Sequence, residues 1–125
     1  MLQTLSIKNV ALIKKLSIDF AEGFNVLLGE TGAGKSIIID SLNFVLGAKA
    51  DKSLIRYGEN EMRVDALFSS ISEQNQQALS QLGYEDEEIC LTRTLNLEGK
   101  STVRINGMVA SVSILKEIFV SAIYS

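Results

Sequence analysis

The chain has 125 residues, which is enough for one small domain with a buried core, and its 46% apolar and 22% charged residues are ordinary for a soluble globular protein. Its net charge of −3 gives no overall electrostatic reason to expect nucleic-acid binding, although a local basic patch would be compatible with it. Histidine is absent and Cys90 is the only cysteine, which excludes an internal disulfide and disfavours zinc sites and His-dependent catalytic triads.

Three short strands are predicted before residue 29. An apolar-rich segment at about 2–8 and a segment at 13–20, in which apolar and polar residues alternate from Leu16 to Phe20, predict the first two strands. Glu22-Gly23 then predicts a turn, and the apolar run at 24–28 predicts a third, buried strand.

A small basic cluster accompanies the first two strands. Lys14 and Lys15 are expected near the bend between these strands, and Lys8 lies at the end of the first one. The three ammonium groups could contact a phosphate of a nucleotide or of DNA, but a solvated edge of the sheet is the favoured interpretation.

Residues 29–36 fit the phosphate-binding motif G-x-x-x-x-G-K-[ST] and lie between the predicted strand and a predicted helix. Backbone N–H groups of such a loop surround the phosphates, because glycines let the backbone come close and the helix N-terminus is electropositive. Lys35 is expected to reach the β- and γ-phosphates as the catalytic residue, and Ser36 to ligate Mg²⁺. The predicted nucleotide-binding residues are Gly29, Glu30, Thr31, Gly32, Ala33, Gly34, Lys35, Ser36 and Ile37.

The helix after the loop is predicted from Ile37 to Leu46. The isoleucines of its apolar stripe are expected in the core, and Gly47 suits the C-terminal end of the helix. The predicted apolar stripe consists of Ile37, Ile38, Leu42, Val45 and Leu46.

A polar connection follows at 48–60. It contains Lys49, Lys52 and Arg56 but only Asp51 as an acid between Lys49 and Arg56. Both a phosphate-contacting segment and isolated surface charges are compatible with this composition, and both interpretations stay open.

The next segments alternate between strand and helix patterns. Period-two alternation predicts a strand at 62–68, and the capping-box pattern at 70–73 predicts the start of a helix that continues to Gly83. The acidic run at 85–88 is interpreted as a solvated turn rather than as a metal site.

The last third predicts a hairpin and a final helix. The strands of the hairpin are expected at 89–95 and 101–105, and Asn106-Gly107 is a strong turn signal. A helix is then predicted from Ser111 or Ser113 to the end of the chain, with an apolar face of five residues. That face consists of Leu115, Ile118, Phe119, Ala122 and Ile123.

The sequence also bears on cellular location. Cys90 is interpreted as a small core residue, and a single thiol is compatible with a reducing cytoplasm. No apolar run approaches the roughly 18 residues of a membrane-spanning helix, and the N-terminus lacks a signal-peptide pattern. We therefore expect a cytoplasmic protein without membrane contacts.

The order of these elements differs from that of a simple P-loop kinase or GTPase, because two strands precede the P-loop strand and antiparallel strands follow its helix. It resembles the first lobe of an ABC-type ATPase head, in which an antiparallel sheet lies beside the nucleotide-binding core. Five segments carry a closer resemblance: 1–13, 29–37, 46–48, 53–58 and 103–107. Together they resemble the RecN family of bacterial SMC-like DNA repair proteins, over residues 1 to about 115.

The resemblance implies an α/β fold of the P-loop NTPase class, namely the N-terminal lobe of an ABC/SMC-type ATPase head with an added antiparallel sheet. It implies ATP and Mg²⁺ as cofactors, a role in recombinational repair of DNA double-strand breaks, and a homodimer whose two heads sandwich ATP. It also implies association with the nucleoid. By resemblance, Arg56 lies in a segment similar to the arginine loop of SMC-like heads and would contact DNA or the nucleotide.

Several parts of such a head lie outside the matched segments. In this family they are the Q-loop glutamine, the signature loop, the Walker B aspartate with its catalytic glutamate, the switch histidine and the coiled coil. We therefore expect residues 1–125 to form the N-terminal lobe alone, with the second lobe and the coiled coil absent and the second lobe as its partner. Such a lobe should bind ATP with Mg²⁺ but hydrolyse it poorly. The last ten or so residues fit the family poorly.

Two other functions stay open. A self-sufficient small P-loop enzyme would need a Walker B-like aspartate at the end of a second apolar strand, and neither Asp40, in the helix after the loop, nor Asp65, in mid-strand, suits this role. A non-catalytic interaction piece would account for the apolar face of the last predicted helix. Nucleotide binding that is lost in Lys35→Ala would distinguish the ATP-binding lobe from such a piece.

Overall fold

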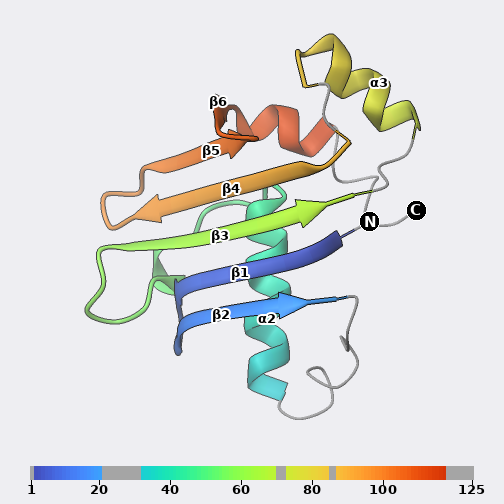
Figure 1. Cartoon of the computed structure of the whole chain (residues 1–125). Coiled ribbons are helices and arrows are strands. Elements are labelled where there is room, and N and C mark those ends of the chain that lie inside the picture. Colours follow the sequence, from blue (N-terminus) through green and yellow to red (C-terminus); the bar gives the residue numbers. More distant parts are fainter. Residues whose placement is uncertain (1, 21–31, 70–72, 85–86, 118–125) are drawn as a thin grey trace.

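A six-stranded antiparallel sheet organises the molecule (Figure 1). The structure is a computed structural model, and it describes residues 2–20, 32–69, 73–84 and 87–117. The strands are β1 (Leu2–Val10), β2 (Ile13–Asp19), β3 (Glu61–Phe68), β4 (Ile89–Asn96), β5 (Ser101–Ile105) and β6 (Met108–Ala110). Their order in the sheet is β2-β1-β3-β4-β5-β6, and every neighbouring pair is antiparallel. The expected antiparallel sheet is thus confirmed.

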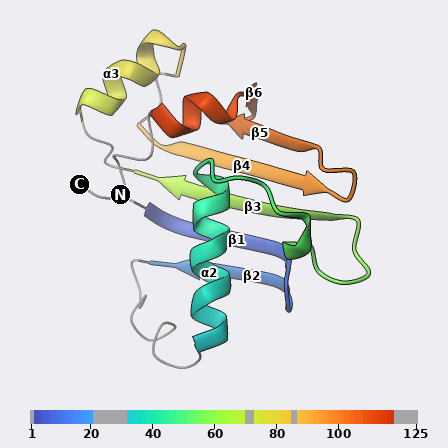
Figure 2. The same cartoon turned by 180° about the vertical axis from the view of Figure 1, so that it is seen from behind.

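Helix α2 (Gly32–Val45) lies across one face of this sheet, with its N-terminal end near β2 and its C-terminal end near β4 (Figure 2). The short 3₁₀ helix η1 (Lys52–Leu54) follows it, and α3 (Glu73–Gln81) connects β3 to β4. A further helical segment covers 112–117 after β6. Within the part of the chain that the structure describes, no helix combines the length and the apolar character needed to cross a bilayer.

The core lies between α2 and the sheet, because alternate strand residues point toward the helix. In β4, for example, every second side chain is buried, from Ile89 to Leu95. On the helix, Ile38, Phe44 and Val45 are buried against this face. The predicted stripe is confirmed, since each of its residues is buried or half-buried and packed on the core, whereas Ile39, which is not part of the stripe, is 43% exposed.

Gly47 ends α2 in the predicted way. The Ala48 N–H donates to the Asn43 carbonyl and the Gly47 N–H to the Phe44 carbonyl, which is the hydrogen-bond pattern of a Schellman motif. Gly47 has φ = +113°, a backbone conformation that residues with a Cβ rarely adopt.

The bend after β1 lies at Ala11 and Leu12, and Lys14 and Lys15 lie near it in the first residues of β2, as predicted. Two other features differ from the predictions. Strand β6 was not predicted, although Asn106-Gly107 signalled the turn that precedes it. Helix α2 begins at Gly32, five residues before the predicted start at Ile37, because the end of the glycine-rich loop is itself helical.

Other predictions fall only partly on described residues. The helix at 112–117 begins at Ser111, whose side-chain oxygen accepts a hydrogen bond from the Ile114 N–H at 3.3 Å, as expected of an N-cap. Its predicted continuation, the predicted strand at 24–28 and the first half of the acidic run lie outside the described residues.

Candidate nucleotide site at the start of helix α2

Lys35 and Ser36 lie in the first two turns of α2, where both side chains are exposed. The first backbone N–H groups of a helix have no partner within the helix, so this end carries a partial positive charge. No acidic side chain occupies the first turn of α2. This helix end therefore suits an anion, with an ammonium and a hydroxyl group beside it. Of the other predicted site residues, 29–31 lie outside the described residues.

The residues that follow Ser36 anchor this end of the helix. Ile37 is half-buried and Ile38 is buried in the core, so the start of α2 is held by apolar contacts while the neighbouring polar side chains face solvent. Ser41, one turn further on, is fully buried, and its Oγ has no hydrogen-bond partner among the described residues. A small side chain thus lies at this fully buried position of the helix, and its hydroxyl group has no partner among the described residues, which is energetically costly.

The C-terminal end of α2 is bound by an arginine that the sequence analysis missed. Arg93 in β4 is only 3% exposed. Its Nη1 donates to the carbonyls of Phe44 at 2.7 Å and Ala48 at 2.5 Å, and its Nε donates to Ser101 Oγ in β5 at 2.8 Å. Its guanidinium carbon lies 4.3 Å from the centroid of the Phe44 ring, within cation–π range. Burial lowers the pKa of the Arg93 guanidinium, but such a group stays protonated in proteins.

A signal for Arg93 was present in the sequence. Alternation in the strand predicted at 89–95 puts residue 93 on the same face as three apolar residues, where a charged side chain is out of place. The sequence could not show what the cation would meet there. That partner is the end of a helix some 45 residues earlier in the chain, whose last carbonyls carry a partial negative charge.

Arg56 lies at the end of the sheet where β1 turns into β2. Its backbone N–H donates to the Asn9 carbonyl at 2.9 Å, and the neighbouring Ala11 N–H donates to the Leu54 carbonyl at 2.7 Å. The Arg56 side chain is 37% exposed and lies 3.8 Å from Glu59. Among the described residues, no hydrogen bond or ion pair joins Arg56 to the start of α2.

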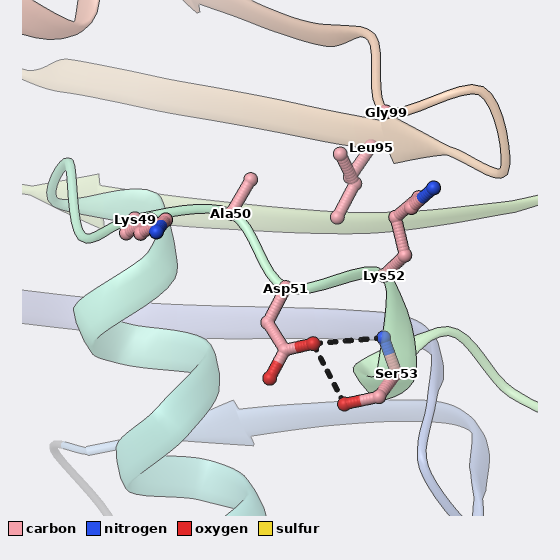
Figure 3. A pocket seen from close by; sticks show the side chains of 7 residues that line it. All are labelled: Lys49, Ala50, Asp51, Lys52, Ser53, Leu95 and Gly99. Atoms are coloured by element: carbon pink, nitrogen blue, oxygen red, sulfur yellow. Dashed lines mark hydrogen bonds between the residues drawn. The ribbon is translucent and has the colours of Figure 1, made fainter.

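The lysines of the polar connection border a separate cavity of about 700 Å³ (Figure 3). Lys49 follows the C-terminal end of α2, so this cavity lies away from Lys35 and Ser36. Asp51 also lines it, and its Oδ1 accepts hydrogen bonds from the Ser53 hydroxyl at 2.7 Å and the Ser53 N–H at 2.9 Å. These hydrogen bonds lower the pKa of Asp51. An ionised carboxylate in the wall makes this cavity a poor phosphate site.

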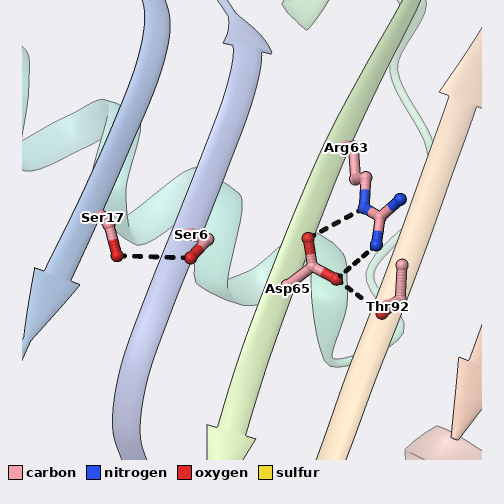
Figure 4. A network of polar contacts seen from close by, with 5 residues as sticks. All are labelled: Ser6, Ser17, Arg63, Asp65 and Thr92. Atoms are coloured by element: carbon pink, nitrogen blue, oxygen red, sulfur yellow. Dashed lines mark hydrogen bonds and ion pairs between the residues drawn. The ribbon is translucent and has the colours of Figure 1, made fainter. Parts of the chain in front are cut away.

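The face of the sheet opposite α2, here called the open face, carries a polar network (Figure 4). Asp65 accepts from Arg63 Nε at 2.9 Å, from Arg63 Nη2 at 3.1 Å and from the Thr92 hydroxyl at 2.6 Å. The hydroxyls of Ser6 and Ser17 lie 3.4 Å apart on the neighbouring strands. Since Asp65 points away from α2 and is engaged in this network, it does not serve the start of the helix.

The predicted basic cluster is divided between the two faces of the sheet. Lys8 and Lys15 are directly opposite each other in the β1–β2 register, and Arg63 is opposite Lys8 on β3. Lys14, one residue before Lys15, points to the other face because successive strand residues alternate. Lys8 and Lys15 are both exposed on the open face, which agrees with the favoured interpretation of the lysines as solvated surface charges.

Cys90 does not belong to the core. It alternates with the buried residues of β4 and is half-buried on the open face, so its interpretation as a core residue is wrong. Burial, with a smaller contribution from the Asp65 carboxylate, raises the pKa of its thiol. The described residues contain no group of three or more Cys, Asp or Glu side chains that could bind a metal ion. Within the acidic run, Glu87 and Glu88 are exposed.

Comparison with protein families gives a match over nearly the whole chain. A family model described as the RecF/RecN/SMC N-terminal domain matches residues 1–124, so the expectation that the resemblance stops at about residue 115 is wrong. DNA repair protein RecN of Bacillus subtilis (strain 168) is 39% identical over 123 residues, and RecN of Halalkalibacterium halodurans is 42% identical over 123 residues. Each alignment covers 94% of this chain but 21% of the relative, so the chain spans about a fifth of the length of these curated relatives.

Solved structures agree with this match. A chain from a study of ATP-driven dimerization and DNA-stimulated activation of SMC ATPases superposes with a TM-score of 0.74 at 26% identity, covering 99% of this chain and 80% of that one. The SMC head domain from Thermotoga maritima superposes with a TM-score of 0.64 at 21% identity, covering 93% of this chain and 41% of that one, which supports the fold alone. The fold is therefore that of the N-terminal lobe of an SMC/ABC-type ATPase head.

Proposed function

Because the chain belongs to the RecF/RecN/SMC N-terminal domain family, we propose that it is the lobe of an SMC-like ATPase head that binds ATP with Mg²⁺ at the start of α2. One observation carries the proposal. Lys35 and Ser36 are exposed next to each other in the first turns of α2, at an electropositive helix end without acidic side chains, within a stretch that fits the phosphate-binding motif.

The two side chains have different tasks. The Lys35 ammonium is a compact point charge that would approach the β- and γ-phosphate oxygens, where most of the negative charge of a triphosphate lies. The Ser36 hydroxyl oxygen would serve as one ligand of Mg²⁺, a hard cation that prefers oxygen. The ion, when bound, neutralises charge on the β- and γ-phosphates.

The lobe alone should hydrolyse ATP poorly. Hydrolysis needs a side chain that positions the attacking water in line with the leaving group. Asp65 is bound by Arg63 and Thr92 on the open face, and Asp40 is exposed one turn after Ser36 on the same helix. Neither carboxylate is arranged for this task, which favours a head that needs its complementary lobe for turnover.

The name of these curated relatives suggests the cellular process. They are DNA repair proteins, and we propose that this chain takes part in recombinational repair of DNA double-strand breaks, with the second lobe of the head as its partner. The solved SMC ATPases to which it is similar undergo ATP-driven dimerization, so a homodimer formed around ATP is the corresponding proposal for the assembled head.

Titration with a fluorescent ATP analogue tests the nucleotide site. Wild type should bind the analogue saturably in the presence of Mg²⁺, and Lys35→Ala should weaken binding by at least about 100-fold, because it removes a charge in contact with the phosphates. Lys49→Ala is the matched control, since it removes an exposed lysine near the other end of α2 and should leave the dissociation constant unchanged. Equal binding by wild type and Lys35→Ala would contradict the proposed site. No binding by wild type would favour a non-catalytic interaction piece.

A further inference from the structure

The buried guanidinium of Arg93 suggests a role in nucleotide binding at a distance. A buried cation is costly unless it is paired, and no ion pair to Arg93 is found among the described residues. Its hydrogen bonds go instead to two carbonyls at the C-terminal end of α2 and to Ser101 on β5. An apolar side chain at position 93 would fill the core without this cost. The arginine therefore contributes something that an apolar side chain could not, namely its hydrogen bonds to the end of α2.

We infer that Arg93 is a positioning residue for the nucleotide site: it fixes the orientation of α2 on the sheet and thereby the place of Lys35 and Ser36 at the opposite end of the helix. The inference rests on the proposed function, since it concerns the affinity of that same site.

The contacts of Arg93 are directional, which distinguishes them from the rest of the interface. Hydrogen bonds restrict angle as well as distance, and the stacking on Phe44 adds a fixed plane. The apolar contacts of Ile38, Phe44 and Val45 with the sheet hold the helix down but tolerate sliding and tilting, since burial of apolar surface has no preferred direction.

The length of α2 turns a small rotation into a large displacement. A helix of 14 residues is about 21 Å long, so a tilt of about 5° at its C-terminal end moves its N-terminal end by about 2 Å. A displacement of about 1 Å at a reacting group can change a rate about 100-fold, and a polyphosphate held by several short hydrogen bonds is similarly sensitive. Loosening of the Arg93 contacts should therefore displace Lys35 and Ser36 and weaken nucleotide binding, although no residue of the site is substituted.

The test compares three variants with wild type at a temperature at which an unfolding curve shows each protein to be fully folded. Arg93→Met keeps the approximate volume and removes the charge and the hydrogen bonds. Arg93→Lys keeps a charge that can reach a carbonyl but loses the fork and the stacking. Val103→Ala is the matched control: Val103 lies opposite Arg93 in the β4–β5 register, so this variant creates a small cavity beside Arg93 but keeps the charge and the groups that hydrogen-bond to α2.

The readout is the dissociation constant of the fluorescent ATP analogue with Mg²⁺. We expect Arg93→Met to raise it at least tenfold and Arg93→Lys to give an intermediate value, while Val103→Ala lowers the unfolding midpoint but keeps the dissociation constant within about twofold. A purely structural Arg93 would lower stability in the same way as Val103→Ala and leave the affinity unchanged.

Each result decides the inference. Arg93→Met within twofold of wild type would overturn it, and so would an equal loss of affinity in Val103→Ala. If Arg93→Met does not fold, Arg93→Lys decides, because a folded Arg93→Lys with wild-type affinity overturns the inference. Failure of both variants to fold would make Arg93 a requirement of the fold and would equally overturn it. A wild type that binds no analogue refutes the proposed function itself, which is a distinguishable outcome.

Discussion

Replacement of Gly47 by alanine should destabilise the protein through two separable effects. Gly47 closes α2 with φ = +113°, and an L-residue forced into positive φ costs about 1–2 kcal/mol. A Cβ at this position would also lie 3.1 Å from Lys116 Cγ, 3.5 Å from Leu115 Cβ and 3.6 Å from Val112 Cγ1. The first of these contacts is tighter than ordinary van der Waals contact, so the helix at 112–117 must move or Lys116 must change its conformation.

The expected total is a loss of about 2–3 kcal/mol in the free energy of unfolding, since crowding in a packed contact adds about 1 kcal/mol or more to the backbone cost. For a domain of this size, such a loss lowers the melting temperature by about 8–12 °C. Urea unfolding followed by circular dichroism gives the free energy, and a heating curve gives the midpoint.

Gly58→Ala is the matched control. Gly58 also has positive φ, +86°, but a Cβ there would meet nothing within 4 Å. Gly58→Ala should therefore cost only the backbone strain, about 1–2 kcal/mol. If Gly47→Ala is no more destabilising than Gly58→Ala, the packing of the 112–117 helix on the end of α2 contributes nothing measurable and the reasoning is refuted. If both variants are as stable as wild type, the backbone argument fails as well.

Three further changes test other parts of the structure. Ser41→Ala should raise the free energy of unfolding by about 1 kcal/mol, because it removes a buried hydroxyl group without a partner among the described residues. A lower stability of the variant in urea would show that the hydroxyl group makes a hydrogen bond in the folded protein. Lys15→Glu should stabilise the sheet by about 0.2–1 kcal/mol, because it places a carboxylate opposite Lys8. This gain in the free energy of unfolding should shrink as NaCl is added, and a gain that is independent of salt would refute the electrostatic cause. Asp51→Ala should lower the urea midpoint at neutral pH. Hydrogen bonds from Ser53 lower the pKa of Asp51 in the folded protein. The stability that the Asp51 carboxylate contributes is therefore present above its unfolded pKa of about 3.9 and is lost as the pH falls through the folded pKa. A difference in stability between variant and wild type that persists at about pH 2 would contradict this.

The predictions from sequence succeeded where a local pattern is enough. Apolar-rich segments, alternation and a hairpin signal located β1 to β5, because these patterns are short-range features of half-buried strands. Gly47 was recognised as the end of α2 because only glycine adopts its φ readily. The phosphate-binding motif is also a local pattern of eight consecutive residues. Of these residues, Lys35 and Ser36 are exposed near the start of α2, and their role in nucleotide binding stays a prediction.

The predictions failed where the outcome depends on which residues meet across the fold. Cys90 was assigned to the core because it is apolar in character, but its place in the β4 alternation puts it on the open face. The basic cluster was taken from neighbours in sequence, whereas the register removes Lys14 from it and brings in Arg63 from two strands away.

The amino-acid sequence by itself determined the class of the fold, the family and the position of the candidate phosphate-binding residues, because each of these depends on patterns within short segments. Only the tertiary structure decided how the helix that carries those residues is held. Nothing in its own strand explains why a cation occupies position 93. The explanation is the fold, which packs the C-terminal end of α2, with its partial negative charge, against the Arg93 guanidinium.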